Sequence, residues 1–202
     1  GVSSFGFGGT NSHITIEEAP QKKIHSKKEG WMPVCLSAKT PGALSRRLTD
    51  LYQWLISDFA YGTIDDLART LLFGREHFQF RACFIVKNMN ELTEMVKKVL
   101  NGIKVDRFFQ NDENLTQHDS QNSIEKAKMA IINKIRISRK NDDMKYWKRL
   151  SALGELFVRG ADIEWHVLFK IKGYNRLALP GYPFSRNYHW FVQEKAFHEP
   201  LS

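Results

Sequence analysis

The sequence predicts an α/β (α+β) domain in which a small three-stranded sheet carries helices packed on one face. Three observations lead to this prediction. Short apolar runs rich in strand formers alternate with amphipathic stretches between residues 31 and 110. Residues that start and stop helices delimit those stretches. Residues 161–202 are dense in aromatic side chains and proline, which predicts an extended C-terminal segment that wraps around another body.

The composition excludes several classes of protein. The chain has 202 residues, of which 42% are hydrophobic and 26% are charged, so it is not disordered throughout. No run approaches the roughly 18 apolar residues of a membrane span, and the first residues lack the pattern of a secretory signal. Cys35 and Cys83 are too few for a disulfide scaffold. We therefore expect a cytoplasmic protein with reduced core cysteines and no membrane partner.

The first segment, residues 1–20, is rich in glycine and ends in an alternation over residues 13–16 that predicts a strand. Its glycine run suggests a phosphate-binding loop, but no Lys-Ser/Thr pair follows and no strand-then-helix context surrounds it. A backbone that passes close to another surface is the better interpretation. The polar, lysine-rich residues that follow predict a linker, which we place at residues 21–33.

The central segment, residues 34–110, begins within an apolar run over residues 31–38 that predicts the first strand of the sheet. Thr40 followed by Pro41 predicts the start of a helix, because threonine caps a helix and proline fits its first turn. This helix is expected to end near Asp58. Its apolar face contains Leu44, Leu48, Leu51, Tyr52, Leu55 and Ile56, and its charged face contains Arg46, Arg47 and Asp50.

Four further elements complete this segment. Thr63 is expected to cap a second helix, which Gly74 ends. Residues 81–86 predict a second strand, residues 91–100 a third amphipathic helix, and residues 105–110 a third strand. The order is therefore β-α-α-β-α-β. A small sheet with helices on one face is the economical packing for three helices that each have one apolar side.

Residues 111–160 form an insertion with a basic character. Residues 111–123 are polar and predict a loop, and two amphipathic helices are expected over residues 124–135 and 144–157. Residues 124–149 contain nine Lys/Arg and three acidic residues, which contributes +6 (9 − 3) to the net charge of +8. This stretch is either a solvated helical face, the commoner case, or a docking patch for an acidic partner. Nucleic acid is disfavoured, because aromatic residues are not interleaved with these cations.

The sequence shows no catalytic or metal-binding pattern. His13 lies beside Ser12, but no serine or cysteine sits in a recognisable nucleophile turn, so His13 is interpreted as structural. The other histidines lack the i, i+3 or i, i+4 spacing of a helical metal site. We expect no metal and no catalysis by this chain.

Both ends of the chain resemble a known family. GVSSFGFGGTNSHITIEEAP, at residues 1–20, resembles the C-terminal end of a polyketide synthase ketosynthase, in which a GFGGTNxH loop lies near the active-site cavity. Residues 34–110 look like the linker subdomain that flanks such ketosynthases. The tail, residues 161–202, contains RLALPGYPFSRNYHW and is similar to the LPxYPFxRxxYW segment that wraps back over the ketosynthase. Ser12 stands where alanine is usual in the family, and Gly181 where threonine is commoner.

The resemblance implies a trans-acyltransferase polyketide synthase. In synthases with a built-in acyltransferase, that domain lies between the linker subdomain and the tail, whereas here only residues 111–145 separate the two. The catalytic cysteine and histidines of the family lie upstream and match nothing here. The resemblance thus implies a non-catalytic docking and scaffold subdomain without a cofactor of its own, although the parent synthase would use phosphopantetheine carrier proteins.

The resemblance and the charge pattern together give three groups of candidate residues. The remnant of the ketosynthase active-site loop comprises Phe7, Gly8, Gly9, Thr10 and Asn11. The residues expected to pack the tail are Trp165, Leu179, Pro180, Tyr182, Pro183, Phe184, Arg186, Tyr188 and Trp190. The candidates for partner docking, chosen outside the apolar stripes, are Arg75, His77, Lys126, Lys134 and Arg136.

The expected partners are the adjoining ketosynthase and a trans-acting acyltransferase, with neither nucleic acid nor a membrane among them. The alternative function is lateral self-association within a synthase assembly. The basic insertion resembles, in place and helical character, the element by which some trans-acyltransferase ketosynthases associate laterally.

Overall fold

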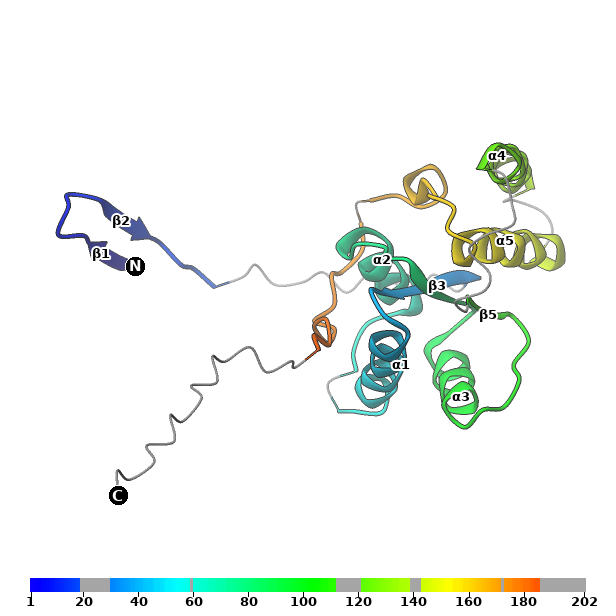
Figure 1. The fold of residues 1–202 in the computed structure, drawn as a ribbon, viewed down its shortest axis with the longest axis horizontal. Helices are drawn as coiled ribbons and strands as arrows, with labels where there is room; N and C mark the ends of the chain where they lie inside the picture. The colour runs from blue at the N-terminus through cyan, green and yellow to red at the C-terminus, as the bar shows by residue number, and fades with distance from the viewer. Residues whose placement is uncertain (19–29, 59, 112–120, 139–142, 172, 186–202) are drawn as a thin grey trace, which may run out of the picture.

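A computed structural model describes the following residues of the chain (Figure 1): 1–18, 30–58, 60–111, 121–138, 143–171 and 173–185. In chain order, the elements are β1 (Val2–Phe5), β2 (Asn11–Ile14), β3 (Met32–Ala38), α1 (Pro41–Leu55), α2 (Ile64–Gly74), β4 (Phe80–Val86), α3 (Met89–Leu100), β5 (Phe108–Gln110), α4 (Gln121–Ser138), α5 (Asp143–Val158) and a short 3₁₀ helix (Trp165–Val167). Within these residues, no helix is both long enough and apolar enough to cross a membrane.

The sheet of the central domain is antiparallel, with β4 between β3 and β5. Cys35 of β3 lies opposite Cys83 of β4, and Cys83 lies opposite Phe109 of β5. All seven residues of β3 are buried. Because successive side chains of a strand point to opposite faces, the burial of every residue means that both faces of the sheet are covered. The predicted α+β class and three-stranded sheet are confirmed.

Helices lie on both sides of this sheet, whereas the sequence predicts helices on one face. α1 and α3 lie on one side, and α5, with α4 behind it, lies on the other (Figure 1). Gly154 of α5 approaches the sheet so closely that an added Cβ would lie 3.0 Å from the Sγ of Cys83. Helical periodicity identifies the apolar face of α5, but it carries no information on which side of a sheet that face packs.

Side-chain caps start α1, α2 and α3, and the first two of these caps are predicted from the sequence. The Oγ1 of Thr40 accepts a hydrogen bond from the N–H of Ala43, so α1 begins as expected. Thr63 and Asp66 form a reciprocal capping box at the start of α2. The third cap is Asn88, whose side chain accepts from the N–H of Glu91, so α3 begins at Met89 and not at the predicted residue 91.

Arg81 connects the sheet to the end of α5. Its Nη1 donates to the carbonyls of Phe157 and Ala161, at 3.0 and 2.8 Å, and its Nε donates to the carbonyl of Phe78 at 2.7 Å. The guanidinium also lies 4.7 Å from the centre of the Phe157 ring. Burial lowers the pKa of Arg81, and these three carbonyls are the acceptors that a half-buried guanidinium requires.

The N-terminal hairpin, residues 2–14, consists of β1 paired antiparallel with β2. The predicted strand over residues 13–16 lies two residues earlier in the structure, as β2. β1 is not predicted, because its two adjacent serines leave no alternation of apolar and polar residues. Every described residue from 1 to 18 is exposed. The hairpin therefore contributes no buried side chain to the central domain.

Candidate interaction site

The C-terminal strap, which we define as residues 173–185, lies in an extended conformation along α2 and then across the start of α1 (Figure 1). Two side chains of α2 accept hydrogen bonds from its backbone. The Oδ1 of Asp66 accepts from the N–H of Asn175 at 2.6 Å, and the Oγ1 of Thr70 accepts from the N–H of Leu177 at 3.0 Å. Because these side chains bind N–H groups of the strap's own backbone, they fix the position of the strap along α2 at two points.

Basic side chains hold the second half of the strap by its carbonyl groups. The Nη2 of Arg75 donates to the carbonyls of Leu179 and Pro180, both at 3.2 Å. The Nη2 of Arg46 lies 3.4 Å from the carbonyl of Pro183. Hydrogen bonds with a charged donor are the stronger kind, so these arginines reinforce the contacts made by α2.

Apolar side chains anchor the strap in the body. Leu177 is 3% exposed and fills the space beside Gly62, where an added Cβ would lie 2.8 Å from the leucine Cδ2. The ring of Tyr182 meets the ring of Phe78 edge-on at 5.5 Å, and its hydroxyl accepts from the N–H of Lys39 at 2.9 Å. The ring of Phe184 lies edge-on to the ring of Tyr182, with the ring centres 4.9 Å apart, and Phe184 remains 76% exposed.

The residues expected to pack the tail occupy three kinds of position. Trp165 is buried with Phe157 and Phe169 in the core between α5 and the tail. The strap contains Leu179, Pro180, Tyr182, Pro183 and Phe184, of which the first four are half-buried and Phe184 is exposed. Arg186, Tyr188 and Trp190 lie outside the described residues, and their packing stays a prediction.

Two of the docking candidates make contacts within the chain. Arg75 holds the strap, as described above. The ring of His77 lies edge-on against Phe157, with the ring centres 5.1 Å apart. Burial, and secondarily the charge of Arg81, lowers the pKa of His77, and its Nε2 has no hydrogen-bond partner within the described part of the chain. Their roles as partner contacts remain untested.

The remaining candidates lie on α4. Lys126 and Lys134 are exposed, while Arg136 belongs to the helix but its side chain is outside the described residues. Lys128 is different, because it is 6% exposed, donates to the carbonyl of Asp162 at 2.9 Å and pairs with Glu125 at 2.6 Å. The lysines of α4 therefore include both exposed side chains and one buried side chain, Lys128, that binds within the chain. Counting charges in the sequence cannot separate these two kinds of lysine.

The predicted loop remnant, residues 7–11, closes the hairpin. The N–H of Gly6 donates to the carbonyl of Thr10 at 2.8 Å, and Gly9 adopts a positive φ of 84°, which favours glycine. On the strands, the Oγ of Ser3 lies 2.7 Å from the Nδ1 of His13. The loop residues Phe7, Gly8, Gly9, Thr10 and Asn11 are all exposed, and their role in a ketosynthase active site stays a prediction.

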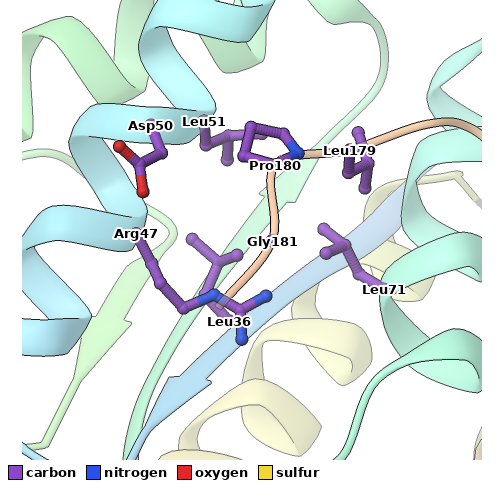
Figure 2. A pocket seen from close by; sticks show the side chains of 8 residues that line it. All are labelled: Leu36, Arg47, Asp50, Leu51, Leu71, Leu179, Pro180 and Gly181. Atoms are coloured by element: carbon purple, nitrogen blue, oxygen red, sulfur yellow. The ribbon is translucent and has the colours of Figure 1, made fainter. Parts of the chain in front are cut away.

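A pocket lies where the strap crosses α1 and β3 (Figure 2). Its empty volume is about 260 Å³, counting space that is open to solvent. It is lined by Leu36, Arg47, Asp50, Leu51, Leu71, Leu179, Pro180 and Gly181. The sequence places Arg47 on the charged face of α1, but the structure buries it, with its Nη1 donating to the carbonyl of Ser37 at 2.9 Å.

The described residues contain neither a cluster of three metal-ligating side chains nor a reactive thiol. No group of three or more His, Cys, Asp and Glu side chains among those residues could hold a metal ion. Cys35 and Cys83 are buried and unbridged, with their sulfur atoms 3.7 Å apart, and burial raises the pKa of Cys35. A buried thiol with a raised pKa is a poor nucleophile.

Comparisons with known proteins agree with this arrangement. Residues 1–85 match the family described as a ketoacyl-synthetase C-terminal extension. Polyketide synthase ThaG of Burkholderia thailandensis is 30% identical over 194 residues, which cover 94% of this chain and 3% of that protein. Polyketide synthase PksL of Bacillus subtilis is 29% identical over 215 residues, covering 100% of this chain and 4% of that protein. The chain thus spans only a few per cent of these relatives.

Solved ketosynthase structures resemble the fold as well. The ketosynthase from module 1 of the bacillaene synthase of Bacillus amyloliquefaciens is 28% identical, with a TM-score of 0.67 over 93% of this chain and 30% of that chain. The ketosynthase from module 6 of the bacillaene synthase of Bacillus subtilis is 26% identical, with a TM-score of 0.65 over 94% of this chain and 31% of that chain. These matches identify the chain as the C-terminal region of a polyketide synthase ketosynthase.

Proposed function

We propose that the chain is a non-catalytic docking and scaffold subdomain of a trans-acyltransferase polyketide synthase. It packs against the adjoining ketosynthase through its N-terminal hairpin and presents α4 to a free-standing acyltransferase. It needs no cofactor of its own, and the phosphopantetheine of carrier proteins belongs to the chemistry of the parent synthase.

The exposed hairpin is the observation that carries this proposal. Large apolar side chains are exposed on it and on the residues that adjoin it, namely Val2, Phe5, Phe7, Ile14 and Ile16. A lone two-stranded hairpin is at best marginally stable in water, and grouped exposed apolar residues mark an interface. Because residues 1–85 match a ketosynthase extension, the ketosynthase is the body that covers the hairpin.

Two further observations support a non-catalytic role in a trans-acyltransferase system. The described cysteines are buried against α5, where a substrate thioester cannot reach them. β5 ends at Gln110 and α4 begins at Gln121, so the connection is far too short to contain an acyltransferase domain. This spacing supports the part of the proposal that assigns acyl transfer to a free-standing acyltransferase.

Hydrogen exchange tests the contact with the ketosynthase. The amides of residues 2–14 are measured in this chain alone and in a longer chain that includes the adjoining ketosynthase. We expect exchange to be at least about tenfold slower in the longer chain, because its neighbours cover the hairpin. Equal rates in both chains would exclude packing of the hairpin on the ketosynthase.

Charge reversal tests the docking surface on α4. Lys126→Glu with Lys134→Glu changes two exposed lysines, and calorimetry measures the affinity for the cognate acyltransferase. We expect it to weaken about tenfold. The matched control is Lys97→Glu with Lys98→Glu, which changes the same charge on the exposed face of α3. Unchanged affinity in the α4 variant, or equal weakening in both variants, would remove α4 from the interface.

Lateral self-association is the second candidate function. The exposed residues of α4 include the apolar Ala127, Met129 and Ala130 beside the two lysines, and such a mixed face can also meet another copy. Sedimentation at rising salt separates the candidates. A homotypic apolar contact predicts dimers that survive high salt, whereas attraction between α4 and an acidic acyltransferase weakens as ions screen it.

A further inference from the structure

Arg47 is a buried cation with few partners. The residue is 8% exposed, and its Nη1 donates to the carbonyl of Ser37 at 2.9 Å. A guanidinium carries five N–H donors. Within the described part of the chain, Arg47 makes this one hydrogen bond and no ion pair. Its remaining donors lie at the pocket between α1, β3 and the strap, as Figure 2 shows.

The surroundings do not neutralise this charge. Four leucines form the apolar walls of the pocket: Leu36, Leu51, Leu71 and Leu179. Burial, and secondarily the charge of Arg75, lowers the pKa of Arg47, while Tyr182 and Asp50 act weakly in the opposite direction. Asp50 lines the same pocket but forms no ion pair with Arg47. None of the nitrogen atoms of Arg47 is among the buried side-chain atoms of the described residues that lack a partner, so its free donors face the open pocket. An anion that enters the pocket can replace water at these donors.

We propose that this pocket binds a carboxylate group, with Arg47 as the donor and with Leu179, Pro180 and Gly181 of the strap forming one wall. The planar donor fork of arginine matches a carboxylate. Asp50 in the lining favours an anion with one charge over a phosphate with two. Because the pocket is open to solvent, a carboxylate can approach Arg47 from outside. Either a free short-chain carboxylic acid or a glutamate side chain of a partner protein can supply this group.

The test uses the full chain and nuclear magnetic resonance. The Nε–Hε signal of Arg47 and the amide signals of Leu36 and Gly181 are followed while sodium acetate replaces sodium chloride at constant ionic strength. We expect saturable shifts of all three signals. A second titration with a blocked Gly-Glu-Gly peptide separates the two sources, because tighter binding of the peptide favours a partner protein and tighter binding of acetate favours a free acid.

Variants assign the binding to Arg47. Arg47→Met is expected to weaken acetate binding at least about tenfold, as the loss of a charge-assisted hydrogen bond predicts. Asp50→Asn is expected to tighten it several-fold, because a like charge leaves the pocket. Arg159→Met, at an exposed site at the end of α5, is the matched control and should bind acetate as the unchanged chain does.

Three results would overturn the proposal. The first is the absence of saturable shifts, and the second is an equal response to acetate and to chloride alone. The third is equal binding by the Asp50→Asn variant and the unchanged chain. Because Asp50 makes no hydrogen bond within the described residues, this variant keeps the test open even where Arg47→Met fails to fold. None of these readouts depends on an acyltransferase or a ketosynthase.

Discussion

The hairpin at one end of the chain and the strap at the other are both peripheral segments with large apolar side chains, yet they differ in what covers them. Leu177 of the strap is 3% exposed, whereas Phe5 of the hairpin is 79% exposed. The strap is held by side chains of α1 and α2 that bind its backbone, while the hairpin makes its described hydrogen bonds within itself.

This difference separates two kinds of interface in one chain. The strap has its complementary surface within the domain, so its contacts stabilise the isolated chain. The hairpin has its complementary surface elsewhere, so its apolar side chains affect stability only when that surface is present. Substitutions in the two segments therefore test different assemblies.

The largest contrast is expected between two truncations to alanine. Leu177→Ala leaves a cavity beside Gly62 and should lower the free energy of unfolding by about 3 kcal/mol. Phe5→Ala removes a larger side chain from an exposed position and should change it by less than about 0.5 kcal/mol. Urea unfolding of the two variants measures both values. A similar loss in both would mean that the hairpin is already packed in the isolated chain.

A smaller effect is expected from the hydrogen bond between α2 and the strap. Thr70→Val keeps the shape of the side chain but leaves the buried N–H of Leu177 without its acceptor, which should destabilise the chain by about 1.5 kcal/mol. The control is Thr49→Val on α1. The hydroxyl of Thr49 donates to the carbonyl four residues earlier, as the hydroxyl of Thr70 does, but it accepts no hydrogen bond from the described strap. We expect less than about 0.5 kcal/mol there.

The smallest effect is a dependence of the free energy of unfolding on pH, which comes from His77 between α2 and β4. Burial lowers the pKa of His77 below its usual 6.5, so the unfolded chain takes up the proton more readily than the folded chain. The neutral ring thus contributes its full stability above pH 6.5. This contribution is lost as the pH falls below that value, by at most about 1.4 kcal/mol per pH unit.

His77→Gln should remove this part of the dependence, whereas His13→Gln, on the exposed hairpin, should leave it unchanged. Urea unfolding at pH 7.5 and at pH 5.5 compares the two variants with the unchanged chain. Identical slopes in all three chains would show that the pKa of His77 does not change on unfolding, which contradicts the prediction.

Local signals in the sequence account for most of the helices and strands. Thr40 with Pro41, and Thr63 with Gly74, give the start of α1 and both ends of α2 because capping depends on neighbouring residues alone. The sequence does not predict that α5 packs on the second face of the sheet. Periodicity identifies the apolar side of a helix but not where the helix lies in the fold. β1 is missed because its short alternation contains two serines.

The candidate site is less predictable than the fold. The aromatic and proline content of the tail indicates an extended segment, but not that Asp66 and Thr70 accept its backbone. Arg47 is interpreted as a surface residue because its neighbours in sequence are charged, and its burial depends on a strap that lies more than a hundred residues away. Such pairings between distant residues leave no local pattern.

Asp66 connects the strap to the folding of α2. One carboxylate oxygen, Oδ2, accepts from the N–H and the hydroxyl of Thr63, while the other, Oδ1, accepts from the N–H of Asn175. A detached strap leaves the bonds to Thr63 in place, but a frayed first turn of α2 removes the acceptor for Asn175. The first turn of α2 therefore supports the strap at Asn175, while Asn175 in turn gives no support to the cap of α2.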